Sequence, residues 1–92
     1  MAVDVEQTLT ERGTRYGHFK DHAEIAQQLK GVIGSFIIQR ACNMAPDQHE
    51  ALEMICHKIA RIINGDPDYA DSWVDIAGYA KLVADRLQGV VR

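Results

Sequence analysis

Proline and cysteine are both scarce in this chain. Only two of the 92 residues are proline, Pro46 and Pro67, and each stands where a new helical pattern begins. That is the favoured first-turn position for proline. The two cysteines, Cys42 and Cys56, are far apart, form no CxxC pair and lie among apolar residues. We therefore expect two reduced thiols in the core of the protein.

Long apolar runs are also missing. No run approaches the roughly 20 apolar residues that a membrane-spanning helix requires. The first residues lack the basic and apolar regions of a signal peptide. These absences predict a cytoplasmic protein that has no membrane partner.

No charge of one sign dominates the chain. The formal net charge is -3, and no block of like charge or basic stripe is present. Duplex nucleic acid is therefore not an expected partner, because binding it requires several phosphates to be neutralised by Lys or Arg. A small phosphate ligand remains open, since one or two cations or a bound metal would suffice for it.

A chain of 92 residues, 47% hydrophobic and 25% charged, has the composition of an ordinary globular protein. We expect a single domain over residues 1–92. A domain of this size buries only about two-thirds of its unfolded surface. Oligomerisation would supply the missing burial.

The first half of the chain predicts two helices. A short one is expected from about Asp4 to Glu11. Two glycines in the segment from Arg12 to Gly17 break regular structure, so this segment is predicted to be a loop. From about His18 to Cys42, apolar residues recur at helical spacing and predict a long helix.

Two further helices are predicted in the second half. One runs from Pro46 to Asn64 and ends at a Gly65 cap. Asp66 is the expected N-cap of the other, which begins at Pro67 and reaches about Leu87. Because this last helix is apolar on more than one side, we expect it to be the central helix. The predicted fold is all-α, a compact bundle of three main helices and a short N-terminal helix.

Carboxylates gather on the last two predicted helices. Glu50 and Glu53 are three residues apart, and Asp71 and Asp75 are four apart, so each pair shares one side of its helix. A divalent cation would relieve the repulsion within each pair. Solvation near a helix N-terminus, where the dipole favours anions, is the simpler explanation. Helices joined by a short turn are antiparallel, so the pairs approach only if Glu53 lies opposite Asp75.

These residues resemble a known enzyme family. Segment 49–53 resembles the ExxE element of the MazG-like all-α nucleoside triphosphate pyrophosphohydrolases, and segment 71–80 resembles their second acidic helix. Segment 50–87, with Tyr16-Gly17, is similar to small phage-type members of that superfamily. The second acidic element of the superfamily is usually ExxD. Here Ser72 stands three residues before Asp75, and the acid is displaced to Asp71.

The resemblance implies hydrolysis of a nucleoside triphosphate, an NTP or a dNTP, to the monophosphate and pyrophosphate. The cofactor would be Mg²⁺, or Mn²⁺ in its place, which suits carboxylate ligands. The family also implies a homo-oligomer, a dimer or a tetramer. The implied metal ligands are Glu50, Glu53, Asp71 and Asp75, with Glu53 and Asp75 as the catalytic pair. The implied nucleotide contacts are Lys58, Arg61, Arg15 and Tyr16, with Arg12 beside them.

Two other functions remain open. The same fold could bind a nucleotide or a metal without turnover, and Ser72 in place of the usual acid favours that alternative. It could also be a helical oligomerisation or interaction domain of phage origin, in which the acids are simply solvated. Binding of divalent ions separates the last function from the others, and product formation separates the enzyme from the binding module.

Overall fold

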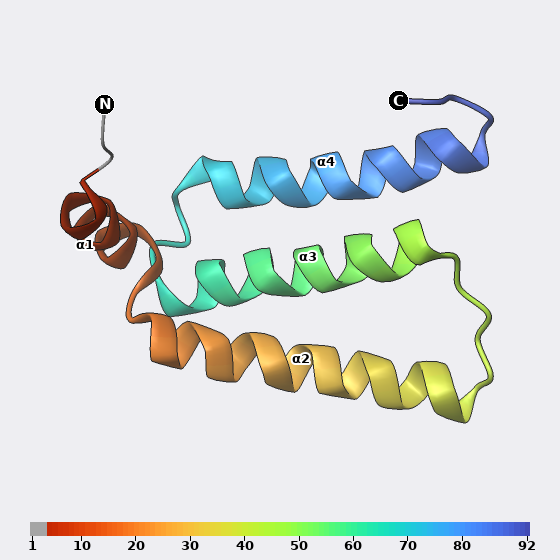
Figure 1. The fold of residues 1–92 in the computed structure, drawn as a ribbon, viewed down its shortest axis with the longest axis horizontal. Helices are drawn as coiled ribbons and strands as arrows, with labels where there is room; N and C mark the ends of the chain where they lie inside the picture. The colour runs from red at the N-terminus through yellow and green to blue at the C-terminus, as the bar shows by residue number, and fades with distance from the viewer. Residues whose placement is uncertain (1–3) are drawn as a thin grey trace.

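The computed structural model describes residues 4–92, which form four helices and no strand (Figure 1). The helices are α1 (Val5–Tyr16), α2 (Phe19–Gln39), α3 (Pro46–Asn64) and α4 (Ala70–Leu87). The prediction of an all-α fold with three long helices and a shorter N-terminal one is confirmed.

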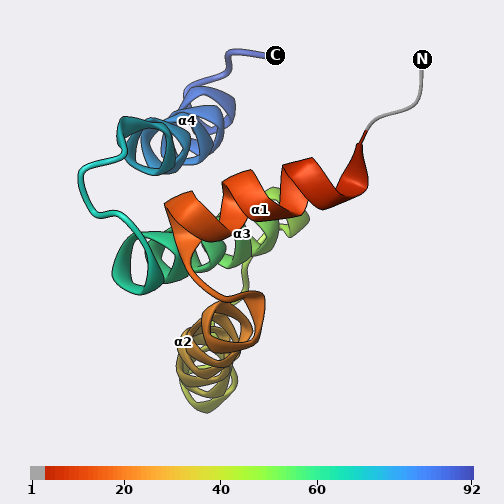
Figure 2. The same cartoon turned by 90° about the vertical axis from the view of Figure 1, so that its left-hand side faces the viewer.

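The three long helices lie side by side in one layer, with α3 in the middle (Figure 1). Helix α1 crosses one end of this layer and lies on one side of it (Figure 2). The prediction that the last helix is central is wrong, because α4 contacts only α3 among the described helices. The additional apolar residues of α4 face outward instead of packing within the chain.

Helix α1 is longer than predicted. Residues 12–16, predicted to be a loop, continue the helix, and only Gly17 ends it. A single glycine such as Gly13 costs a helix about 1 kcal/mol relative to alanine, which does not interrupt a helix that is capped elsewhere. The cap is the Asp4 carboxylate, which accepts a hydrogen bond from the Gln7 N–H at 3.1 Å.

The other boundaries differ by a few residues. Helix α2 ends at Gln39, before the predicted Cys42, because Ala41 adopts a left-handed φ of 47°. Helix α3 begins at Pro46 and ends at Asn64 as predicted. Helix α4 begins at Ala70, since Asp66 does not cap it. The Asp66 carboxylate instead accepts a hydrogen bond from the Asp68 N–H at 2.9 Å and closes a turn.

Two glycines let the end of α1 approach the end of α3. A Cβ on Gly65 would overlap the backbone of Arg15 and Tyr16, and a Cβ on Gly17 would overlap the backbone of Asn64. Gly17 also has a φ of +77°, which favours glycine. The Asn64 side-chain amide donates to the Tyr16 carbonyl at 2.8 Å. These contacts place the last turn of α1 beside the last turn of α3.

The buried apolar core of the described residues is small and consists of short side chains: Ala26, Ala51, Cys56 and Ala60. Both cysteines are free thiols, but only Cys56 is in the core, and its burial raises the pKa of the thiol. The prediction of a buried Cys42 is wrong, because α2 ends before this residue. No helix within residues 4–92 is long and apolar enough to cross a membrane.

Candidate functional site

The four predicted metal ligands lie in separate surroundings. Glu50 lines a cavity beside Arg86 of α4, whereas Glu53 lines another one beside Lys30 of α2. Within residues 4–92, no group of three or more His, Cys, Asp or Glu side chains could hold a metal ion. Glu50 and Glu53 are therefore not gathered at one point with Asp71 and Asp75.

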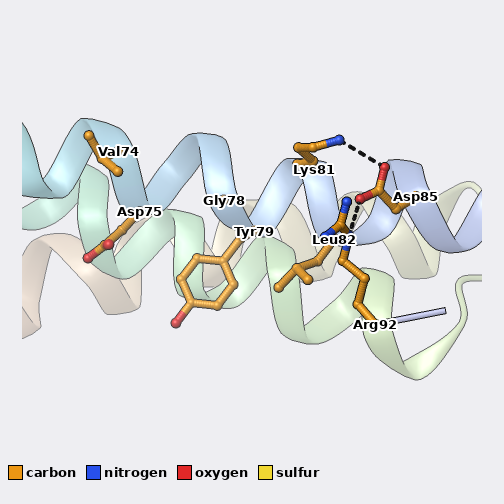
Figure 3. A pocket seen from close by; sticks show the side chains of 8 residues that line it. All are labelled: Val74, Asp75, Gly78, Tyr79, Lys81, Leu82, Asp85 and Arg92. Carbon is orange, nitrogen blue, oxygen red and sulfur yellow. Dashed lines mark hydrogen bonds and ion pairs between the residues drawn. The ribbon is translucent and has the colours of Figure 1, made fainter. Parts of the chain in front are cut away.

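Both predicted aspartate ligands on α4, Asp71 and Asp75, have protein partners. Asp75 pairs with Lys58 at 2.9 Å, and it lines an open groove of about 470 Å³ along α4, on the same side as Tyr79 (Figure 3). Asp71 accepts a hydrogen bond from the Tyr69 hydroxyl at 2.9 Å, which raises the pKa of that hydroxyl. Mg²⁺ is bound by several oxygen ligands around one point, and the four predicted ligands are not gathered in that way within residues 4–92.

All the predicted nucleotide contacts except Lys58 come together. One cavity of about 550 Å³, here called the guanidinium pocket, lies where α1, α3 and the α3–α4 turn meet. Three of the predicted contacts line it, together with Arg12. The residues that line the guanidinium pocket are Glu11, Arg12, Arg15, Tyr16, Arg61 and Tyr69.

Two of these arginines are stacked on tyrosine rings. The guanidinium carbon of Arg61 is 4.1 Å from the centre of the Tyr16 ring, and that of Arg15 is 4.3 Å from the centre of the Tyr69 ring. The two tyrosine rings meet edge to face, with 6.1 Å between their centres. A guanidinium group stacked on a ring keeps the N–H groups at its edge available for an anion.

The guanidinium pocket is positively charged, although the chain carries a net charge of -3. Its lining has three arginines and one carboxylate, that of Glu11. None of the three arginines forms an ion pair with another residue in the described part of the chain. The charge is therefore available to a ligand.

A second cavity, of about 460 Å³, adjoins the guanidinium pocket, because Arg12, Tyr16 and Arg61 line both. We call it the histidine cavity. Its remaining lining is mostly apolar or aromatic: Leu9, Gly13, Gly17, His18, Phe19, His22 and His57.

A buried imidazole, that of His22, and a half-buried one, that of His57, lie side by side in the wall of the histidine cavity. His22 Nε2 and His57 Nδ1 are 3.2 Å apart, and the rings meet edge to face. Burial, followed by the nearby charge of Arg61, lowers the pKa of His57 to about 4. The pKa of His22 is lowered for the same reasons. Both rings are therefore neutral at neutral pH.

Sequence reasoning missed two residues of this site. Tyr69 lies in the segment predicted as the first turn of a helix, and only the observed turn brings its ring to Arg15. His22 is one of several polar residues on a long helix, and no spacing pattern connects it to His57, which lies 35 residues further along the chain. A tyrosine or histidine near arginines is too common a pattern to have singled out either residue.

The chain matches a known protein family. The sequence model of a family described as Domain of unknown function (DUF6378) matches residues 3–87. No curated protein and no solved structure matches the chain significantly. The resemblance to MazG-like enzymes stays a prediction, because none of these comparisons tests it. The match spans nearly the whole sequence, and the chain belongs to the DUF6378 family.

Proposed function

We propose that this chain binds the phosphate groups of a nucleotide in the guanidinium pocket. The observation that carries the proposal is the convergence of three arginines from two helices around one cavity. Guanidinium groups form paired, charge-assisted hydrogen bonds to phosphate oxygens. Arg12, Arg15 and Arg61 would be the phosphate ligands.

The stacked tyrosines prepare this site for binding. Ordering a long side chain on binding costs about 0.5–1.5 kcal/mol. Arg15 and Arg61 already rest on the rings of Tyr69 and Tyr16, so part of that ordering is complete before the ligand arrives. The backbone contacts of Gly17 and Gly65 keep the two helices at the spacing that the stacks require.

The histidine cavity suits the nucleoside part of the ligand. Its volume of about 460 Å³ lies within the usual range of ligand pockets. Tyr16 and Phe19 offer ring faces on which a base can stack. Because the cavity shares Arg12 and Arg61 with the guanidinium pocket, a ligand with its base in one cavity could place its phosphates in the other.

Calorimetric titration with a panel of NTPs and dNTPs, in EDTA and then in Mg²⁺, tests the proposal. Charge-assisted hydrogen bonds contribute about 1.5–3 kcal/mol, so Arg61→Gln is expected to weaken binding roughly 10- to 100-fold. Arg40→Gln is the matched control, because Arg40 lies at the opposite end of the layer. Equal affinity of the two variants would remove the guanidinium pocket as the site.

Inorganic triphosphate separates the two halves of the proposal. If it binds as tightly as every nucleotide, the histidine cavity does not hold the base. If neither it nor any nucleotide binds to the folded protein, the proposed function is wrong.

Hydrolysis of the bound nucleotide to monophosphate and pyrophosphate is the second candidate function. One observation favours it: Asp71 is hydrogen bonded to Tyr69, which lines the guanidinium pocket. A carboxylate therefore stands close to where the phosphates would lie. Pyrophosphate release in Mg²⁺ or Mn²⁺, with an EDTA control, tests this function. Release that survives unchanged in both Asp71→Asn and Asp75→Asn would rule out these carboxylates.

A further inference from the structure

The layer formed by α2, α3 and α4 is one helix thick and has two faces. Helices α2 and α4 each contact α3 but do not contact one another. Helix α1 lies on one side of the layer only (Figure 2). Among the described residues, no helix covers the other side. The side chains on that side show whether it is a polar surface suited to water or an apolar surface suited to a partner.

The contacts of α3 show which of its side chains lie on the open side. His57 contacts α2, Lys58 pairs with α4, and Arg61 covers a ring of α1. Beyond Gln48 in the first turn, the side of α3 opposite Arg61 carries apolar residues at spacings of three and four. These residues are Leu52, Ile55, Ile59 and Ile62.

The outer helices each add an apolar stripe on the same side. Ser72 and Val83 lie on the side of α4 that faces α3, and His22 and Ala26 lie on the side of α2 that faces α3. Each residue of a right-handed helix is rotated by about 100° from the one before it. The residues a quarter turn from the side that faces α3 can therefore be identified, and one such set on each helix lies on the side of the layer away from α1. The stripe of α4 is Trp73, Ala77, Ala80, Ala84 and Leu87, and that of α2 is Ile25, Leu29, Val32 and Phe36. Together with the four residues of α3, they form what we call the apolar face.

On α2 and α4, large side chains of the apolar face are exposed in the single chain, while the four residues of α3 between them are half-buried. Trp73 is 54% exposed, Val32 58% and Leu87 60%, while no large side chain among the described residues is fully buried. Single exposed apolar residues are common on protein surfaces, but a contiguous patch across three helices marks an interaction site.

The total surface supports this conclusion. The chain exposes 6873 Å², whereas a folded monomer of 10.3 kDa exposes about 5,400 Å². Its radius of gyration is 15.4 Å, against about 12 Å for a compact domain of this length. The excess area is about 1,500 Å² per chain, which is nearly twice the roughly 800 Å² that each partner buries in a standard interface.

We infer that a second copy of this chain covers the apolar face and that the folded protein is a face-to-face homodimer. Covering the excess area on both chains would bury about 3,000 Å², which is in the range of obligate homodimers. Such an interface is isologous, because the same face of each chain meets itself.

The sizes of the side chains indicate how the two copies are arranged. The middle of the α4 stripe is small, with Ala77, Ala80 and Ala84, whereas the α2 stripe is bulky throughout. Large side chains pack best against small ones. A two-fold axis parallel to the helices places α2 of each chain over α4 of its partner and α3 over α3. The dimer would therefore consist of two layers, with each α1 on the outside.

Light scattering and sedimentation of the wild-type protein test the dimer. We expect twice the mass of the 10.3 kDa chain and a Tm that rises with protein concentration, as it does when unfolding is coupled to dissociation. A folded wild-type monomer whose Tm is independent of concentration would overturn the inference.

Matched charge insertions test the face. Val32 lies on the apolar face and Val5 lies on α1, and they are 58% and 62% exposed in the single chain. Val32→Glu is expected to lose the dimer mass or to fail to fold, and Val5→Glu is expected to keep it. A Val32→Glu protein that remains dimeric, with the stability of Val5→Glu, would exclude this face.

Disulfide trapping tests the arrangement in a Cys42→Ser background. A mixture of Val32→Cys and Ala80→Cys chains is expected to form cross-linked dimers between unlike chains. Val32→Cys alone is expected to form none, because the two copies of α2 lie at opposite edges of the dimer. Cross-linking of Val32→Cys alone would overturn this arrangement.

Discussion

The two ends of the helical layer are held together by different kinds of contact (Figure 1). At the end crossed by α1, backbone meets backbone: the Asp66 N–H donates to the Arg15 carbonyl at 2.8 Å, and Gly17 and Gly65 leave no room for a Cβ. At the other end, side chains form ion pairs. Arg86 makes two hydrogen bonds to Asp47, at 2.6 and 2.7 Å, and Arg92 pairs with Asp85 at 2.6 Å.

The comparison explains why the candidate site lies at the α1 end. Backbone contacts cannot change rotamer, so they hold Arg15 and Tyr16 in one position relative to Arg61. Ion pairs between exposed side chains are screened by water and contribute little to stability. Residues in the guanidinium pocket are therefore positioned by backbone contacts, whereas the exposed Arg86–Asp47 pair holds the opposite end less firmly.

The largest effect is expected from Gly65→Ala. The new Cβ would overlap the backbone of Arg15 and Tyr16, and such overpacking costs about 1–3 kcal/mol. Gly31→Ala is the matched control, because its Cβ would meet nothing within 4 Å, and an alanine there should stabilise α2 by up to about 1 kcal/mol. Urea unfolding should therefore give changes of opposite sign. A stabilising effect of both substitutions would show that the two backbones do not touch.

A smaller effect is expected from Asn64→Ala. The Asn64 amide donates to the carbonyls of Tyr16 and His18, at 2.8 and 3.0 Å, and each such hydrogen bond contributes about 0.5–1.5 kcal/mol. The loss should be accompanied by faster hydrogen exchange in α1. Asn43→Ala, at the other end of the layer, serves as the control. If the two variants have the same stability, Asn64 does not connect α1 to α3.

Acid should weaken the α1 end before the other end. The pKa of His57 is about 4 in the folded chain and about 6.5 when unfolded, so between these values the unfolded state binds more protons. Stability is complete above about pH 6.5 and falls as the pH decreases toward 4. The pKa values of Asp47 and Asp85 are also lowered in the folded chain. These two carboxylates destabilise the protein in acid too, but only at lower pH, because their contribution is lost as the pH falls below about 4.

Thermal unfolding at about pH 7.5 and about pH 5 measures this difference, since only histidine titrates there among groups with ordinary pKa values. The wild-type Tm should be lower at the acidic pH. His57→Gln removes the titrating group and should reduce the shift. A wild-type Tm that does not change between the two pH values would contradict the burial of the imidazole pair.

The smallest effect is expected at the ion-paired end. Arg86→Ala removes the contact with Asp47, and because both side chains remain about half exposed to water, the change in the midpoint of urea unfolding should be the smallest among these variants. Lys20→Ala, on an exposed lysine of α2, is the control. A loss as large as that of Gly65→Ala would mean that the two ends do not differ in the way proposed.

Local sequence signals predicted much of the fold. Pro46 and Gly65 mark the limits of α3, and apolar spacing predicted α2 and most of α4. The errors occurred where a longer-range contact decides. Asp66 has the chemistry of a helix cap, but its turn is shaped by the hydrogen bond to Arg15. Gly13 resembles a helix breaker, but no contact at that position requires a glycine.

The candidate site was predicted in part. Arg15, Tyr16 and Arg61 were expected to contact a nucleotide and do lie together, whereas Lys58 is paired with Asp75. Glu50 and Glu53 were expected to approach Asp71 and Asp75, but they line two separate cavities, and neither cavity includes those aspartates. Spacing along one helix says nothing about how far the helix is rotated relative to its neighbour.

The sequence by itself determined that the chain is helical, where most of its helices begin and end, and which side chains share a side of each helix. Those properties depend on residues within a turn or two of one another. Only the tertiary structure decided that α3 is the central helix, that Tyr69 meets Arg15, and that one face of the layer is left apolar. Those outcomes depend on the rotation and register between helices. Contacts between residues far apart in the chain set them, and the close approach of Gly17 and Gly65 is one such contact.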